Sequence, residues 1–119
     1  MDIWEAIKKN EVAEIEGLIK SHADLNLKDK NGMTPLMVAV DYDNALIVQS
    51  LIKAKVKLDE VDKYGQTALM LAAGRGNMQF VKLLLAAHAN TKLIAKSKAT
   101  AHNFADENGY KEIAKLLNP

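Results

Sequence analysis

A spacing of 33 residues organises the whole chain. Alanine recurs four times at this interval, and leucine recurs four times in a second column. The two columns are Ala6, Ala39, Ala72 and Ala105, and Leu18, Leu51, Leu84 and Leu117. No insertion or deletion interrupts the register, so the sequence predicts four stacked copies of one structural unit. One unit cannot bury its own apolar side, and stability must therefore come from contacts between neighbouring units.

The two central copies show what a unit contains. They begin with Asp29-Lys30-Asn31-Gly32-Met33-Thr34-Pro35 and with Asp62-Lys63-Tyr64-Gly65-Gln66-Thr67-Ala68. Asp-x-x-Gly is typical of a tight turn, the threonine can cap a helix, and Pro35 suits the first helical position. Apolar residues then follow at helical spacing, with second helices expected over 45–54 and 78–87. Each unit is predicted to be turn, helix, turn, helix.

This pattern resembles the ankyrin repeat, whose usual form contains Asp-x-x-Gly-x-Thr-Pro-Leu-His-x-Ala. The matching residues are Gly32, Thr34, Pro35, Leu36 and Ala39, and then Gly65, Thr67, Leu69, Ala72, Ala73 and Gly76. The resemblance covers nearly the whole chain and implies an all-α ankyrin-repeat solenoid with short turn tips. We expect one domain over 1–119, made of an N-terminal capping unit (1–27), two central units (28–60 and 61–93) and a C-terminal capping unit (94–119).

The chain departs from the family pattern in three places. Met37 and Met70 replace the histidine, so we expect its hydrogen bond within the turn to be missing. His22, Lys55 and His88 replace the glycine after the second helix, where a left-handed backbone disfavours a β-carbon. The fourth copy is degenerate and polar, as expected of an end unit with one neighbour.

Composition excludes several classes of function. The formal net charge of +1 gives no general attraction to nucleic acid or membranes, and the lack of cysteine excludes disulfides and thiol chemistry. No apolar stretch is long enough to span a membrane. The N-terminus lacks the features of a secretory leader, which predicts a cytoplasmic protein, with the periplasm as the alternative if a leader was removed before Met1.

We predict no catalytic residues, no metal site and no cofactor. His22 and His88 are equivalent positions two repeats apart, too distant to share an ion, and His102 lies on a first helix. Residues 41–44 lack the glycine and glutamate of a calcium loop and are interpreted as a turn between helices.

The resemblance implies that a partner binds the concave side, which is formed by the turn tips and the ends of the first helices. The predicted partner-binding residues are Lys8, Lys9, Lys30, Asn31, Met33, Asp41, Tyr42, Lys63, Tyr64, Gln66, Arg75 and Lys96. Half of the sixteen basic residues fall in or beside these places, namely Lys8, Lys9, Lys28, Lys30, Lys63, Arg75, Lys96 and Lys98. They indicate a basic rim, although lysines at turn tips also serve solubility alone.

The sequence therefore favours a non-catalytic protein–protein interaction module that binds a folded protein and is monomeric when free. We expect Tyr42, Tyr64 and Arg75 to be the central anchors. In a more specific form, the chain is a stand-alone inhibitor or self-protection protein that occludes an enzyme. Two alternatives stay open: binding of an anionic ligand, RNA or phospholipid, by the basic rim, and a scaffold fragment of a larger repeat array.

Overall fold

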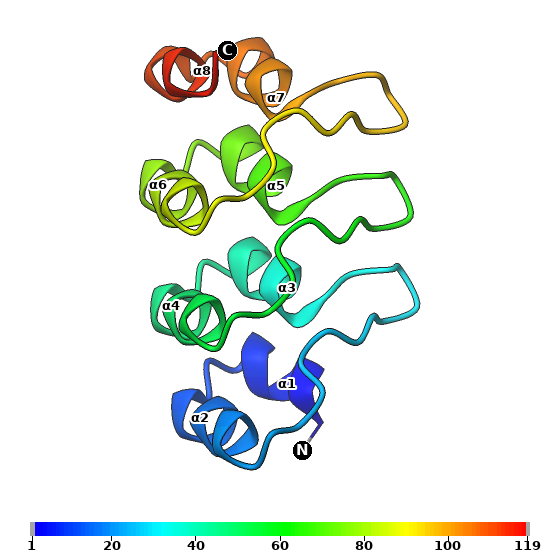
Figure 1. Cartoon of the computed structure of the whole chain (residues 1–119), viewed down its shortest axis with the longest axis vertical. Coiled ribbons are helices and arrows are strands. Elements are labelled where there is room, and N and C mark those ends of the chain that lie inside the picture. The colour runs from blue at the N-terminus through cyan, green and yellow to red at the C-terminus, as the bar shows by residue number, and fades with distance from the viewer. Residues whose placement is uncertain (1, 119) are drawn as a thin grey trace.

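The computed structural model describes residues 2–118 as a stack of helix pairs, 38 × 25 × 22 Å in extent. A turn tip lies between successive pairs, and the tips all project to the same side of the stack (Figure 1). The tips, residues 29–33, 62–66 and 95–99, open the second, third and fourth units, and each is named after its unit. The first helices of the pairs lie next to the tips, and the second helices form the opposite side. The helices are α1 (Ile3–Lys8), α2 (Val12–Lys20), α3 (Pro35–Asp41), α4 (Ala45–Lys53), α5 (Ala68–Gly74), α6 (Met78–Ala86), α7 (Ala101–Glu107) and α8 (Lys111–Leu117).

These bounds confirm the all-α solenoid expected from the sequence, and the predicted second helices end one residue earlier than expected. Met1 and Pro119 lie outside the described residues. The structure does not test whether a leader was removed before Met1. The division into units at residues 28, 61 and 94 stays a prediction.

Threonine caps start three of the first helices. The side-chain oxygens of Thr34, Thr67 and Thr100 each accept a hydrogen bond from the backbone N–H three residues later. Each bond satisfies one of the amides that an α-helix leaves without a partner at its N-terminus. Pro35 occupies the first helical position of α3, where its missing N–H costs nothing.

Aspartate holds the turn tips of the two central copies. One carboxylate oxygen of Asp29 accepts from the backbone N–H of Asn31 at 2.8 Å and of Met33 at 2.9 Å. Asp62 does the same for Tyr64 and Gln66 at 2.9 Å each. The carboxylates therefore fold the tips from within, which confirms the predicted tight turns.

Neighbouring tips are joined to one another through the backbone. The N–H of Lys63 donates to the carbonyl of Asn31, and the N–H of Lys96 donates to the carbonyl of Tyr64, both at 3.0 Å. One such hydrogen bond joins each pair of neighbouring tips and fixes their relative position. Side chains on successive tips thus form regular rows along the stack.

The repeated apolar columns form one continuous core. The alanines at 6, 39, 72 and 105 are completely buried, and their small side chains let neighbouring first helices pack closely. The second helices fully bury three residues each of their expected apolar face, while Ile52 and Leu85 on the same faces are half-buried. These fully buried residues are Ile47, Val48 and Leu51 in α4, and Phe80, Val81 and Leu84 in α6.

Positive φ angles also follow the repeat. The residues in this conformation are Asn10, Asp43, Gly76 and Gly109 between the paired helices, His22, Lys55 and His88 after the second helices, and Gly32, Gly65 and Lys98 in the tips. The strain expected at Lys55 is therefore present, with φ of 63°.

The turn hydrogen bond that we expected to be missing at Met37 and Met70 has a counterpart at Met70, so that expectation is wrong there. The N–H of Thr67 donates to the sulfur of Met70 at 3.5 Å. In the last copy Asn103 takes the same place, and its Oδ1 accepts from the N–H of Thr100 at 2.9 Å. A thioether is a weak acceptor but reaches the same donor from the same helical position.

The end of the stack formed by α7 and α8 is polar, as the degenerate fourth copy predicts. Asp106 stands in the column of the buried Val40 and Ala73, is exposed, and pairs with Lys111 at 3.0 Å. His102 donates from Nδ1 to the carbonyl of Ala114 at 2.8 Å. Polar groups thus occupy positions that hold buried apolar residues in the central copies.

Between residues 2 and 118 the structure contains no helix that is both long and apolar enough to cross a bilayer.

Candidate functional site

The predicted partner-binding residues lie on the turn tips and at the C-terminal ends of the first helices. We call this region, with its neighbours Lys28, Val61, Ile94 and Lys98, the tip surface. Eight of the twelve are exposed, namely Lys8, Lys9, Lys30, Tyr42, Lys63, Tyr64, Arg75 and Lys96. The other four, Asn31, Met33, Asp41 and Gln66, are half-buried. Tyr42 and Tyr64 are the most apolar exposed members, with 50% and 57% of their surfaces accessible.

Arg75 and Asp41 form an ion pair between neighbouring units. Asp41 is the last residue of α3, and Arg75 caps the C-terminus of α5. Both Nε and Nη2 of Arg75 contact Oδ1 of Asp41, at 3.1 and 3.0 Å. The pair holds the guanidinium in a fixed orientation while slightly more than half of the arginine side chain stays exposed. An ordered, exposed arginine loses little side-chain entropy on binding.

Lys63 is oriented by two contacts at the junction of the second and third tips. Its Nζ donates to Oδ1 of Asn31 at 3.1 Å and lies 5.2 Å from the centroid of the Tyr64 ring. A cation over a tyrosine ring is attracted by the negative face of the ring. The structure therefore brings Asn31, Lys63 and Tyr64 together as a preformed polar and aromatic cluster.

The remaining predicted residues are less closely connected. Lys9, which caps the C-terminus of α1, pairs with Glu5 one turn earlier at 3.1 Å. Its ammonium group therefore lies over α1 and is already paired. Met33 packs partly against the core. Gln66 contributes a backbone N–H to the turn. Lys28, which lies just before the second tip, donates to the carbonyl of Val61 at 2.8 Å and lies 3.7 Å from Glu60.

Phe104 lies beside the tip surface, next to the residue that precedes Arg75, and the sequence interpretation missed it. It is half-buried on α7, and its ring lies near Gly74 at the end of α5, where a β-carbon would meet Phe104 Cδ1 at 3.6 Å. The amide of Asn108 donates to the carbonyl of Gly74 at 3.3 Å beside it. The available signal was the column Glu5, Val38, Leu71 and Phe104, which varies in size and charge next to the invariant alanine column.

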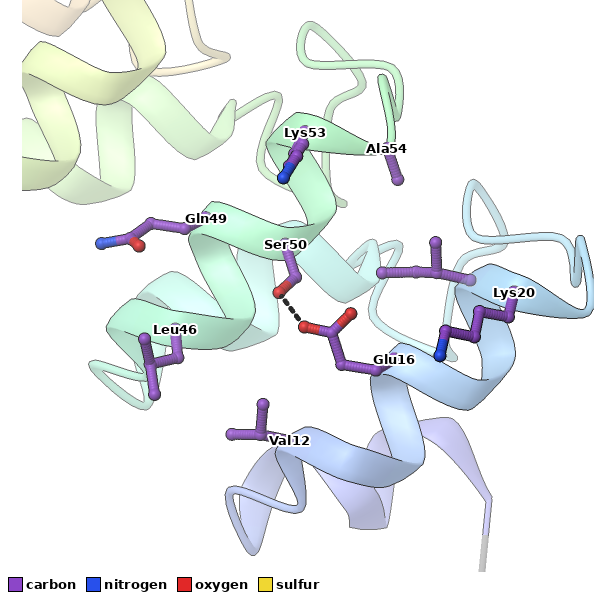
Figure 2. A pocket seen from close by; sticks show the side chains of 9 residues that line it. Val12, Glu16, Lys20, Leu46, Gln49, Ser50, Lys53 and Ala54 are labelled. Carbon is purple, nitrogen blue, oxygen red and sulfur yellow. Dashed lines mark hydrogen bonds between the residues drawn. The ribbon is translucent and has the colours of Figure 1, made fainter.

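The second helices form an open groove on the side away from the tips. It lies between α2 and α4, has a volume of about 640 Å³, and is lined by Val12, Ile19, Leu46 and polar neighbours (Figure 2). Ser50 donates from Oγ to Oε1 of Glu16 at 2.9 Å across it. This exposed serine–carboxylate contact lacks the imidazole base that would activate a serine nucleophile.

Between residues 2 and 118 no three His, Cys, Asp or Glu side chains are close enough together to hold a metal ion. His22 and His88 are exposed at the ends of α2 and α6, and His102 is occupied by the carbonyl of Ala114. The tip surface offers fixed hydrogen-bond donors, aromatic faces and positive charge.

Comparison with known proteins supports the repeat. A family model described as ankyrin repeats (3 copies) matches the chain over residues 3–95 and again over residues 42–118. No curated protein matches the chain.

Proposed function

The chain belongs to the ankyrin repeat family, whose members are generally protein–protein interaction modules, and we propose that it binds a folded protein through the tip surface. The observation that carries the proposal is the row of exposed side chains on tips that are joined by backbone hydrogen bonds. Because the tips are fixed before binding, little conformational entropy is lost when a partner docks.

The composition of the tip surface suits an interface. Tyrosine and arginine are enriched among residues that dominate binding energies, and Tyr42, Tyr64 and Arg75 are all accessible. The lysines of the tip surface suit the solvated rim of an interface, where charge steers the approach of a partner. Tyr42, Tyr64 and Arg75 are our proposed anchors.

In its more specific form, the proposal is that docking occludes an enzyme. The tip surface offers recognition groups without a reacting centre, and covering a partner's active site requires nothing more. On this proposal the module is itself non-catalytic and is monomeric when free.

The test is capture of partners from the native source with the wild-type chain, followed by affinity measurements on the purified partner. The double variant Tyr42→Ala/Tyr64→Ala should weaken binding by more than about 2 kcal/mol, or roughly 30-fold. Leu46→Ala is the matched control, because Leu46 is equally exposed but lies on the opposite side of the stack, in the groove of Figure 2. It should change the affinity less than about threefold.

Equal retention of the partner by the double variant and the wild type would refute the tip surface as the docking site. If the captured partner is an enzyme, its activity is then titrated with the module. Full activity at saturation would refute occlusion while leaving protein binding intact.

A further inference from the structure

The charges of the chain are distributed unevenly along the stack. Residues 1–60 contain eight basic and eleven acidic residues, a net charge of −3, whereas residues 61–119 contain eight basic and four acidic residues, a net charge of +4. The asymmetry is strongest over residues 61–98, which contain six basic residues and one acid. Although the total charge is close to zero, the third unit and the fourth tip (residues 61–98) together have a positive net charge.

The single acid of that segment is withdrawn from the surface. Asp62 is buried, and its Oδ1 accepts from two backbone amides within its own turn. The acid of the second unit nearest to Arg75 is Asp41, which already pairs with it. Glu60, just before the third tip, lies 3.7 Å from Lys28, so positive charge exceeds negative charge at the third and fourth tips.

Three lysines of these two tips are exposed and outside every ion pair found between residues 2 and 118. They are Lys63, Lys96 and Lys98. The backbone bond from Lys96 to Tyr64 places the two tips side by side. The stem of Lys96 also lies near Gly65, where a β-carbon would meet Lys96 Cγ at 3.3 Å. The lysines are thus carried on a fixed frame rather than on a loose loop.

Apolar surface accompanies these charges. Tyr64 is exposed between them, and Val61 and Ile94 precede the two tips with 39% and 61% of their surfaces accessible. Positive charge beside aromatic and aliphatic side chains is the composition of a protein-binding surface, whereas phosphate binding relies on positive charge spread over the whole contact.

We propose that the partner carries a carboxylate-rich segment that docks on the third and fourth turn tips, with its carboxylates at Lys63, Lys96 and Lys98. This inference rests on the proposed function and adds the chemistry of the partner and the end of the stack that it contacts.

The test uses a short fluorescent polyglutamate peptide as the probe and fluorescence anisotropy on the full chain at low and physiological salt. The triple variant Lys63→Glu/Lys96→Glu/Lys98→Glu should weaken binding at least about tenfold, because three attractive charges become repulsive. The control is Lys53→Glu/Lys55→Glu/Lys57→Glu, which changes the net charge equally at three exposed lysines of the second unit. It should weaken binding less than about threefold.

Circular dichroism confirms the fold of both variants before binding is measured. Equal losses in the two triple variants would overturn the inference, because net charge alone would then explain binding. It is also overturned if the peptide fails to bind at low salt, or if single-stranded RNA or phosphatidylserine vesicles bind the wild type more tightly than the peptide.

A second experiment, which measures how tightly the captured partner binds each variant, distinguishes this inference from the proposed function. If the captured partner is released by Tyr42→Ala/Tyr64→Ala but binds the tip triple variant as tightly as the wild type, protein binding stands and the acidic segment is refuted. Loss of partner affinity in the tip triple variant, with affinity retained in the control, supports both.

Discussion

Substitution of Gly65 by alanine tests whether the turn tips support one another. Gly65 has φ of +75°, and a β-carbon there would lie 3.0 Å from the backbone nitrogen of Lys96. The left-handed backbone costs a non-glycine residue about 1–2 kcal/mol. The close approach also pushes the two tips apart and endangers the hydrogen bond from Lys96 to Tyr64, worth about 0.5–1.5 kcal/mol. The variant should therefore lose about 2–3 kcal/mol of unfolding free energy.

Gly109→Ala provides the matched control. Gly109 has a similar φ of +82°, but a β-carbon there would meet nothing within 4 Å. It should therefore show the backbone cost alone, about 1–2 kcal/mol. Urea unfolding followed by circular dichroism gives both free energies, with the denaturant slope checked for changes. Equal losses in the two variants would refute the argument that contact between tips restrains the backbone at Gly65.

Three further predictions concern single residues. Lys55→Gly should raise the unfolding free energy by about 1 kcal/mol by relieving the positive φ after α4, and a lower urea midpoint would contradict this. Asn44→Ala should lower it by about 1–3 kcal/mol, because the buried Asn44 amide donates to the carbonyl of Ile7 in the preceding helix pair, and an unchanged midpoint would show that water replaces the bond. The hydrogen bond and charge of Lys111 hold the pKa of Asp106 below its usual value, so Lys111→Ala should raise that pKa in an NMR titration. Since the folded-state pKa is lowered, the contribution of this pair to stability is present above the ordinary pKa of aspartate and is lost as the pH falls through the lowered value, and an identical titration in both proteins would refute the coupling.

The repeat register allowed the fold to be predicted because identical columns become identical environments in a stack. Ala39 and Ala72 are buried for the same reason, as are Leu51 and Leu84. Turn chemistry was equally readable: the Asp-x-x-Gly turns and threonine caps are local, and each depends on residues at most four positions apart.

Contacts between units were harder to predict because they join residues about one repeat apart. The pairing of Arg75 with Asp41 and of Lys63 with Asn31 depends on side-chain rotamers at a junction, which column identity does not reveal. Phe104 was missed for a related reason. Its column varies, and only the packing of α7 against α5 shows that its ring covers Gly74.

Lys98 shows how position within the stack changes what a column tolerates. It shares a column with Gly32 and Gly65 and has φ of +76°. A β-carbon at either glycine would meet the backbone of the next tip, whereas between residues 2 and 118 no further tip follows the one that holds Lys98. The sequence shows that lysine replaces glycine in this column. The structure gives the reason, which is that no neighbouring tip contacts the β-carbon of Lys98 among the described residues.

The opposite charges at the two ends of the elongated stack have a consequence for the speed of association. The net charge is −3 over residues 1–60 and +4 over residues 61–119, and the two halves lie towards opposite ends of a molecule 38 Å in length. This separation gives the chain an electric dipole moment along its longest dimension. The field of a charged protein exerts a torque on such a dipole and rotates it before the two surfaces touch. An acidic partner would then meet the positive end of the stack first. Added salt would lower the association rate constant far more than it raised the dissociation rate constant.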